Sequence, residues 1–357
     1  MPGVRRREPP RAKARSRRST MNDIAARAGV SQTTVSLVLN NALGARLATH
    51  TRERVLEAAR ELGYKFVRGG RRLSASDATV VGFVVDEMST DPWCAIALDG
   101  VRDKAWEYGL TVRAAVTRGD ADMEQAVLAQ MSNQPLLGLI FGTVQTRQIT
   151  PSPALLQIPT VLLNCHASDR SLPSIVPDEV LGGRSATERL ILAGHRRIGL
   201  IQGEVWMEAS HDRLTGYRQT LADNEIPFDP TIVRPGNWQP SAGYEQTYHL
   251  MKLATPPTAI FCANDLMAMG SHEALKELGL RIPADVSVIG YDDREIARFM
   301  RPPLTTVLLP HLEMGTLALE TLVQQANRPE SRPPQLKVEC PIVERDSIGA
   351  GPAAINS

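Results

Sequence analysis

The sequence has few cysteines and lacks long apolar runs. Four cysteines occur in 357 residues, far apart and without a C-x-x-C pair: Cys94, Cys165, Cys262 and Cys340. Such spacing indicates neither a zinc site nor a disulfide framework, and it suits a reducing compartment. No apolar run reaches the ~18 residues of a membrane-spanning helix, and no apolar segment follows the arginine-rich start as it would in a secretion signal. We therefore expect a cytoplasmic protein with no membrane partner.

The sequence also lacks the short motifs that carry catalysis. The patterns G-x-S-x-G and H-E-x-x-H and the phosphate-binding P-loop are absent, and the seven histidines are scattered. His195, in the segment GHRRI, stands at an expected helix-to-strand junction, and we assign it a structural role. We accordingly expect no enzyme, no catalytic residue, no metal ligand and no cofactor.

Charge is balanced overall but divided along the chain. The net charge is +1 at pH 7, yet 17 of the 40 Lys and Arg residues lie in residues 1–76, together with only 5 of the 39 Asp and Glu residues. Because cations bind phosphates whatever the base sequence, a basic N-terminal part favours a nucleic-acid partner. A solvated basic tail is the alternative for residues 1–20 taken alone. Pro9 and Pro10 argue against an organelle transit peptide, so we interpret residues 1–19 as a disordered basic arm.

The next segment is predicted to form three short helices, at 21–28, 32–40 and 51–62. Thr20 and Ser31 are typical N-cap residues, and Gly29 is a typical helix terminator. A turn as short as residues 29–31 favours a helix-turn-helix over an antiparallel pair of helices. Residues 20–64 therefore predict a small all-α domain, and the glycine-containing, basic residues 65–78 predict a linker.

From residue 79 on, short runs rich in Val, Ile and Leu alternate with amphipathic helical segments. The strands expected are 80–85, 111–116, 136–141, 160–163, 197–201, 258–261 and 286–289. The helices expected are 97–108, 123–131, 182–192, 213–223, 241–253 and 266–278. This alternation predicts parallel sheets covered by helices on both faces, with ligands bound beyond the carboxyl ends of the strands. The pattern is too long for one sheet, so we expect two lobes with a cleft over residues 79–345, then a flexible tail at 346–357.

Several motifs, in one order, resemble the lactose-repressor/galactose-repressor (LacI/GalR) family. They begin with MNDIAARAGVSQTTVSLVLNN and TRERVLEAARELGY and continue through GHRRIGLI, DRLTGYRQTL, PTAIFCANDLMAMG, LGLRIPADVSVIGYDD and PPLTTV. The resemblance covers almost the whole chain. It implies a helix-turn-helix headpiece, a hinge at 65–78 and a two-lobed α/β domain of the periplasmic-binding-protein type with Rossmann-like lobes. It further implies a homodimeric transcriptional repressor that binds double-stranded operator DNA and responds to a small-molecule effector, a sugar.

The second helix of a helix-turn-helix enters the major groove with its first residues on base edges. The predicted reading face consists of Gln32, Thr33, Ser36 and Leu37. Glutamine can pair with adenine, whereas leucine offers only apolar contact. The family usually has arginine at the position of Leu37, so no charged guanine contact is expected there. Alternatively Leu37 is a core residue, although Val35 and Val38 are better placed for that role.

The resemblance also implies contacts with the DNA backbone. Short polar side chains at helix starts suit phosphate oxygens, and some of them cap the helix as well. The matching positions are Thr20, Asn22, Ser31, Thr34 and Asn40.

Beyond Tyr64, itself expected at the DNA, the family has a hinge that becomes helical on the operator and inserts a leucine into the minor groove. By register that leucine is Leu73 here. Gly69 and Gly70 disfavour a helix, so we expect this hinge to fold only on DNA.

Sugar-binding clefts combine charged or amide groups for hydroxyls with an aromatic face for the sugar ring. The resemblance implies effector contacts at expected strand ends or early loops, namely at Asp91, Trp93, Arg213, Trp238, Asn264 and Asp292, with Asp178 as a weaker candidate. Arg213 is alternatively part of a surface ion pair, and Trp238 alternatively closes the cleft edge. Either Asn264 or Asp265 is expected to cap the following helix while the other binds the effector.

The resemblance implies a mechanism in which the effector opens or closes the cleft, shifts the paired lobes of a dimer and so alters the hinge on DNA. Two operator half-sites require a dimer. Two alternatives are a sugar-binding transport receptor, which shares the two-lobed body but has no role on DNA, and a sugar-modifying enzyme of doubly wound fold. The basic helix-turn-helix disfavours the receptor, and the missing acid/base motif disfavours the enzyme.

Overall fold

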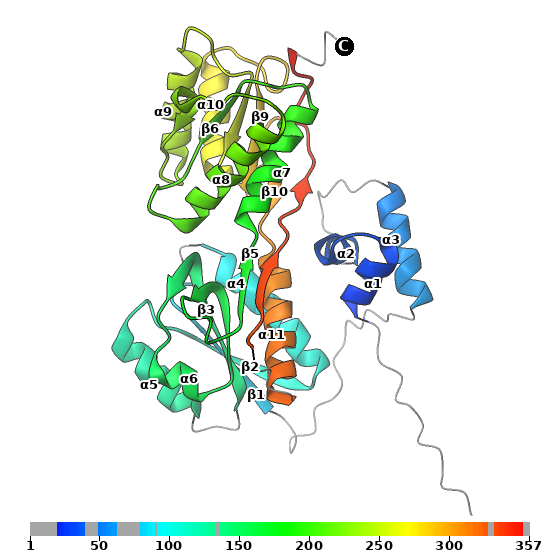
Figure 1. The fold of residues 1–357 in the computed structure, drawn as a ribbon, viewed down its shortest axis with the longest axis vertical. Coiled ribbons are helices and arrows are strands. Elements are labelled where there is room, and N and C mark those ends of the chain that lie inside the picture. Colours follow the sequence, from blue (N-terminus) through cyan, green and yellow to red (C-terminus); the bar gives the residue numbers. More distant parts are fainter. Residues whose placement is uncertain are drawn as a thin grey trace, which may run out of the picture.

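The computed structural model describes residues 20–39, 49–62, 79–89, 91–132, 136–327 and 332–352. They form a helical headpiece and two α/β lobes, and Figure 1 shows the two lobes stacked with the headpiece beside them. The predicted basic arm at 1–19 and hinge at 65–78 lie outside the described residues, as do Asn40, Tyr64 and Leu73.

Three helices make up the headpiece: α1 (Met21–Ala28), α2 (Gln32–Leu39) and α3 (Thr49–Glu61). Thr20 Oγ1 accepts a hydrogen bond from the Asp23 NH (3.2 Å), and the Asp23 carboxylate accepts one from the Thr20 NH (2.7 Å), which completes a capping box. Gly29 ends α1 with φ 62°, a left-handed value that glycine adopts without strain. Val35 and Val55 are fully buried between the helices. The predicted caps are confirmed, while α3 begins two residues earlier than expected.

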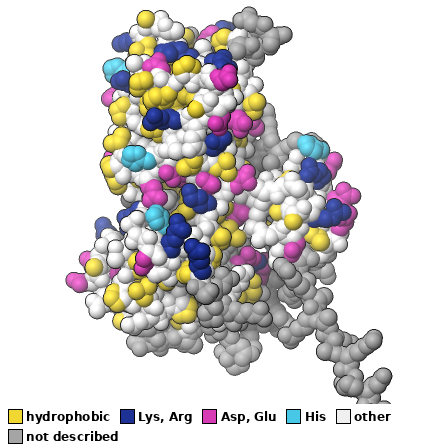
Figure 2. Space-filling view, viewed as in Figure 1, with side chains coloured by type: hydrophobic (Ala, Val, Ile, Leu, Met, Phe, Trp, Pro, Cys, Tyr) yellow, Lys and Arg dark blue, Asp and Glu magenta, His cyan; other side chains and the backbone are white. Residues whose placement is uncertain are grey.

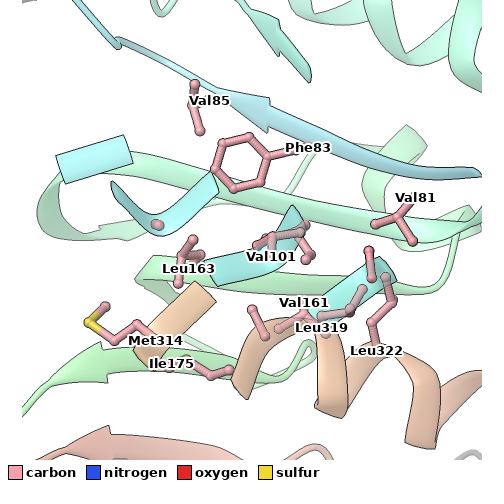
Figure 3. Packing of buried hydrophobic residues seen from close by; sticks show 14 of the residues in the cluster. Val81, Phe83, Val85, Val101, Val161, Leu163, Ile175, Met314, Leu319 and Leu322 are labelled. Carbon is pink, nitrogen blue, oxygen red and sulfur yellow. The ribbon is translucent and has the colours of Figure 1, made fainter. Parts of the chain in front are cut away.

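The lobe nearer the headpiece in sequence, called the N-lobe below, contains a parallel sheet in the order β11-β5-β4-β3-β1-β2. Its strands are β1 (Thr79–Val85), β2 (Leu110–Val116), β3 (Leu136–Ile149), β4 (Thr160–Ala167), β5 (Ser174–Pro177) and β11 (Gln335–Val338). Its helices are α4 (Trp93–Glu107), α5 (Ala121–Ser132), α6 (Pro153–Gln157) and α11 (His311–Asn327). Figure 3 shows Phe83 of β1 and Val101 of α4 in the same apolar core as Leu319 of α11. Gly100 lets α4 approach α11, because a Cβ there would lie 2.0 Å from the Leu312 carbonyl oxygen.

The second lobe, called the C-lobe below, has a sheet in the order β12-β10-β9-β8-β6-β7, in which only β12 runs antiparallel. Its strands are β6 (Ile198–Ile201), β7 (Val233–Arg234), β8 (Ala259–Cys262), β9 (Ser287–Asp292), β10 (Thr305–Leu308) and β12 (Ile342–Val343). Its helices are α7 (Glu179–Leu192), α8 (Glu208–Asp223), α9 (Pro240–Met251) and α10 (Asp265–Glu277), with 3-10 turns at Pro230–Ile232 and Glu295–Arg298. Gly216 lets α8 approach α7, since a Cβ there would lie 2.2 Å from the Val180 carbonyl oxygen.

The chain passes between the lobes three times: from β5 to α7, from β10 to α11, and from β11 to β12. Strand β11 therefore pairs with β5 although more than 150 residues separate them, Gln335 lying opposite Ser174. In Figure 1 these connections run side by side through the waist between the lobes. Lobes joined by a few crossing segments are the arrangement in which hinge movement between domains occurs.

The predicted fold class, a helical headpiece with two parallel α/β lobes, is confirmed. Several short elements were not expected, namely β5, β7, β10, β11, β12 and α6. The long helix α11 was not expected either. Trp93 is the first residue of α4 rather than part of a loop, and α8 starts at Glu208, so Arg213 lies in its second turn.

The predicted flexible tail begins too early in the sequence. Ser347 is fully buried, its hydroxyl accepts a hydrogen bond from the Thr305 NH (2.8 Å), and it donates one to the Val288 carbonyl (2.6 Å). Gly351 also hydrogen-bonds to the carbonyl of Ala193 (2.7 Å). Residues 346–352 are therefore part of the C-lobe, because one serine side chain joins them to both β9 and β10.

Candidate DNA-reading head and effector cleft

The start of α2 carries the residues predicted to face DNA. Ser31 Oγ accepts a hydrogen bond from the Thr34 NH (3.1 Å) and lies 2.9 Å from the Thr34 hydroxyl, so Ser31 caps the helix as expected. Asn22 is exposed and Gln32 is half-buried, whereas Val35 and Val38 belong to the headpiece core. Ser36 and Leu37 lie in α2, but their side chains are outside the described part of the structure.

Thr33 faces the N-lobe instead of open solvent. Only 3% of Thr33 is exposed, and its hydroxyl donates a hydrogen bond to Glu313, near the start of α11. Burial raises the pKa of Glu313 to about 7, against the opposing effect of the Thr33 hydrogen bond. In this arrangement the predicted base contact of Thr33 requires the headpiece to leave α11.

Arg213, in the second turn of α8, lies at the centre of a cluster of buried contacts in the C-lobe. Its guanidinium donates to both carboxylate oxygens of Glu179 (2.8 and 2.9 Å) and to the Ala263 carbonyl, and it lies 3.6 Å from the centroid of the Tyr291 ring. Burial opposes its charge, but the facing Glu179 raises the pKa of Arg213 overall. Because only 3% of Arg213 is exposed, the alternative of a surface ion pair is wrong, and the pair is a buried, bidentate one.

Asn264 and Asp265 divide the roles that the sequence left open. Asn264 Oδ1 accepts a hydrogen bond from the Met267 NH (2.8 Å) and so caps α10, while its Nδ2 donates to the Trp238 carbonyl (3.0 Å). Asp265 is fully buried and accepts hydrogen bonds from the Thr306 hydroxyl (2.6 Å) and the Arg294 NH (2.7 Å). Asn264 is therefore the cap, and Asp265 supports the carboxyl end of β9 from beneath.

Trp238 is held in a fixed position by its surroundings. Its backbone has φ 65°, its indole NH donates to Met207 Sδ (2.8 Å), and its ring lies 5.5 Å from the Arg213 guanidinium. A Cβ on Gly203 would lie 1.9 Å from the ring, so glycine is required beneath the indole. The half-buried ring thus lies next to Arg213.

Asp292, the last residue of β9, links Arg213 to Arg294. Its Oδ1 lies 3.8 Å from Arg213 Nη1, and its Oδ2 accepts a hydrogen bond from Arg294 Nε (3.3 Å). Burial raises the pKa of Asp292, although both arginines act in the opposite direction. Asp292 and Asp293 have φ 110° and 53°, a strained backbone of the kind found at functional sites.

Arg294 connects the C-lobe to the N-lobe. Its guanidinium donates a hydrogen bond to Asp91, which precedes α4, and lies 4.8 Å from the centroid of the Trp93 ring. Trp93 in turn stacks on His311 at 5.0 Å between centroids. All six predicted effector residues are therefore joined in one chain of contacts, in the order Asn264, Trp238, Arg213, Asp292, Asp91 and Trp93, with Arg294 linking the last three.

Sequence reasoning missed Glu179 and Arg294, the two residues that neutralise the predicted ones. Each stands directly beside a quoted motif or candidate: Glu179 follows Asp178, and Arg294 follows the segment ending in Asp293. Asp178, the weaker effector candidate, caps α7 by accepting a hydrogen bond from the Leu181 NH (3.2 Å).

A second bridge crosses between the lobes. His166 at the end of β4 hydrogen-bonds through Nε2 to both carboxylate oxygens of Glu208 at the start of α8 (3.0 and 3.2 Å). Figure 2 shows acidic, basic and histidine side chains gathered where the two lobes meet. His195, expected to be structural, is buried and bonds to Thr258 and Ser287 within the C-lobe (3.0 and 2.9 Å).

Among the described residues, no group of three or more His, Cys, Asp or Glu side chains could hold a metal ion. Nor does any helix in that part of the chain combine the length and apolar character needed to cross a bilayer.

Two family descriptions match the chain. Residues 20–65 match "Bacterial regulatory proteins, lacI family", and residues 187–348 match "Periplasmic binding protein-like domain". The first range contains the helix-turn-helix, and the second contains Arg213, Trp238, Asn264 and Asp292.

Similar proteins span nearly the full chain. The ribose operon repressor of Haemophilus influenzae is 33% identical over 92% of this chain and 98% of its own length, and the repressor PurR of Vibrio atlanticus is 30% identical over the same shares. The CelR–cellobiose complex has a TM-score of 0.63 at 31% identity, covering 92% of this chain and all of that one. The lac repressor dimer bound to operator and the anti-inducer ONPF has a TM-score of 0.65 at 28% identity, covering 94% and 100%. The chain therefore belongs to the LacI family of bacterial regulatory proteins, which are DNA-binding repressors and not enzymes.

Proposed function

We propose that this regulator represses transcription as a homodimer on operator DNA. We further propose that a neutral sugar, bound between its two lobes, controls the affinity of the headpiece for that DNA. The observation that carries the proposal is the chain of contacts at the waist, where Asp91 and Asp292 offer acceptor oxygens beside the rings of Trp93 and Trp238. Carboxylates beside aromatic faces suit a ligand with many hydroxyls and apolar C–H faces.

The relatives support a sugar as effector class. One is named a ribose operon repressor, and one solved structure is titled as a complex with cellobiose. We propose that Arg213 acts chiefly by fixing Asp292, since Glu179 and the Ala263 carbonyl already take three of its donors.

The headpiece is proposed to read DNA with the start of α2. In this proposal Gln32, Thr33, Ser36 and Leu37 contact base edges, and Thr20, Asn22, Ser31 and Thr34 contact the DNA backbone. Asn40, Tyr64 and Leu73 complete the proposed DNA contacts. Two headpieces are needed for two half-sites, and the lac repressor structure is titled as a dimer on its operator. We place the protein in the cytoplasm, where the chromosome is; all four cysteines are free and buried.

The proposal is tested in two steps. Duplexes bound by the purified protein are first selected from random DNA, and binding of the recovered duplex is then titrated with a panel of sugars including ribose and cellobiose. We expect a sequence preference that survives moderate salt and is changed at least tenfold by one neutral sugar. A loss of all sequence preference would contradict the operator role.

Matched variants separate the two activities. Asp292→Asn is expected to abolish the sugar response and keep DNA binding, whereas Gln32→Ala is expected to weaken selected DNA and keep sugar binding measured by calorimetry. Sedimentation at micromolar concentration checks the dimer. If Asp292→Asn responded to sugar like the unmodified protein, the effector would have to bind elsewhere.

A further inference from the structure

Arg294 occupies the same groups that the proposed effector would use. Its guanidinium bonds to Asp91, lies 3.3 Å from Asp292 and covers the Trp93 ring at 4.8 Å. Two acceptor carboxylates and one aromatic face are what a sugar requires, and here a side chain of the protein satisfies all three.

The position of Arg294 is fixed by the C-lobe. Its backbone NH donates to the buried Asp265 (2.7 Å), and the 3-10 turn that begins at Glu295 follows directly. The side chain is 18% exposed and reaches from this anchored backbone across the waist to Asp91 of the N-lobe, which is 35% exposed. A contact between an arginine anchored in one lobe and a carboxylate of the other lobe resists separation of the lobes.

The carboxylates around Arg294 restrict the class of ligand that can replace its guanidinium. Asp91, Asp292 and Asp265 surround Arg294, with Arg213 already paired to Glu179. An anionic ligand in place of the side chain would bring its charge close to the carboxylates of Asp91 and Asp292, whereas hydroxyl groups can donate to them.

We propose that Arg294 is a built-in competitor of the effector: it ties the lobes together through Asp91 when no effector is bound, and a neutral polyhydroxylated ligand must displace it to reach Asp91, Asp292 and Trp93. The choice of ligand rests on the proposed function; the tie between the lobes does not. Only the molecules in which the competing contact is broken can bind the ligand, so the apparent affinity is the intrinsic affinity multiplied by their fraction. Removing the contact therefore strengthens binding.

The first test needs no ligand. Spin labels are placed on Cys substitutions of Leu156 in the N-lobe and Leu192 in the C-lobe, both exposed, while the native cysteines are buried. Arg294→Met keeps an apolar chain over Trp93 but removes every donor. We expect it to lengthen or broaden the distance between the labels, and Asp91→Asn to do the same from the other lobe.

A matched control removes an arginine whose ion pair stays within one lobe. Arg184 bonds to Asp223 (2.7 Å) between α7 and α8, so Arg184→Met is expected to leave the label distance unchanged. The pair of substitutions Asp91→Arg and Arg294→Asp is expected to restore the short distance. An unchanged distance in both Arg294→Met and Asp91→Asn would overturn the proposal.

The second test uses calorimetry with ribose, cellobiose and a negatively charged uronic acid. Arg294→Met is expected to bind the neutral sugar roughly tenfold more tightly than the unmodified protein, and the uronic acid more weakly than the neutral sugar. Weaker binding of the neutral sugar by Arg294→Met would make Arg294 an effector contact and overturn the competitor role. If neither protein bound any neutral sugar, the proposed effector class would fail, and the label distances would still decide whether Arg294 ties the lobes.

Discussion

The two lobes share an architecture but differ in what they bury. Each has a six-stranded sheet with its last strand at one edge, but the C-lobe buries the ion pair of Arg213 with Glu179, whose side chains are 4% and 3% exposed. In the N-lobe, Lys104 and Glu320 form an ion pair that is less completely buried, with side chains 12% and 18% exposed. The same layers therefore carry a fully buried ion pair in one lobe and a less buried pair in the other. Side chains at strand ends, and not the sheet itself, make the site.

The largest expected difference between the lobes concerns these two ion pairs. Glu179→Gln leaves the buried Arg213 without a carboxylate and is expected to cost about 3–5 kcal/mol of unfolding free energy. Glu320→Gln in the N-lobe is expected to cost at most about 1 kcal/mol, since that pair is less buried and Lys104 keeps Glu107 as a partner at 3.0 Å. Urea unfolding of both variants measures the difference. Equal losses would mean that the lobes do not differ in the way they hold charge.

The next prediction concerns a feature that the lobes have in common. Gly100 in the N-lobe and Gly216 in the C-lobe each bring two helices together, with hypothetical Cβ atoms 2.0 and 2.2 Å from a carbonyl oxygen. Either glycine replaced by alanine is expected to lower stability by about 1–3 kcal/mol through overpacking. Thermal unfolding is the measurement.

A control for this pair is Gly119→Ala, where no atom lies within 4 Å of the added Cβ but φ is +70°. That variant reports backbone strain alone. If it lost as much stability as Gly100→Ala and Gly216→Ala, close helix packing would not explain their glycines.

The third prediction is a dependence on pH arising in the C-lobe. Burial lowers the pKa of His272, in α10, to about 4. Because unfolded histidine has a pKa of about 6.5, the unfolded chain takes up the proton first, and stability present above pH 6.5 is lost as pH falls towards 4. At pH 5 the loss is about 2 kcal/mol. His272→Leu is expected to remove this part of the acid sensitivity.

The measurement for His272→Leu is the difference in unfolding free energy from the unmodified protein at pH 7.5 and at pH 5. His249→Leu, at an exposed position of the same lobe, is the control and is expected to show a constant difference. A His272→Leu difference that did not change with pH would refute the role of burial.

The smallest expected effect lies on the N-lobe side that faces the headpiece. Glu313→Ala removes the acceptor that holds the Thr33 hydroxyl, and one such hydrogen bond contributes about 1 kcal/mol. Selected operator DNA is therefore expected to bind up to about fivefold more tightly, as measured by fluorescence anisotropy. Asp99→Ala, on the exposed side of α4, serves as the control. Weaker DNA binding by Glu313→Ala would contradict competition between α11 and DNA.

Much of this fold could be predicted from local sequence. The ends of α1 were predictable from Thr20 and Gly29. The groups that form these caps are close neighbours in the chain, so a short stretch of sequence contains all of them. The long alternating pattern likewise predicted the central strands. Short edge strands such as β11 carry little periodicity, and β11 pairs with β5 from far away in sequence, so only the folded chain brings them together.

The candidate site was predictable in its members but not in their pairing. Asp91 and Asp292 could be placed at strand ends, yet nothing local shows that Arg294 reaches both. Asn264 and Asp265 are adjacent, and either side chain suits a helix cap; the choice depends on Thr306 and the Arg294 NH, which belong to other elements. Contacts across the waist depend on the three crossings and are therefore invisible to a pattern read along the chain.

The crossings also bear on the order in which the protein can be completed during synthesis. The N-lobe sheet needs β11, and its core needs α11, both of which leave the ribosome after the entire β6–β10 part of the C-lobe. The N-lobe thus cannot complete its core until most of the C-lobe has been synthesised, and its apolar face stays uncovered until α11 arrives. A ribosome stalled before α11 would carry a chain with an exposed N-lobe core, a natural substrate for chaperones.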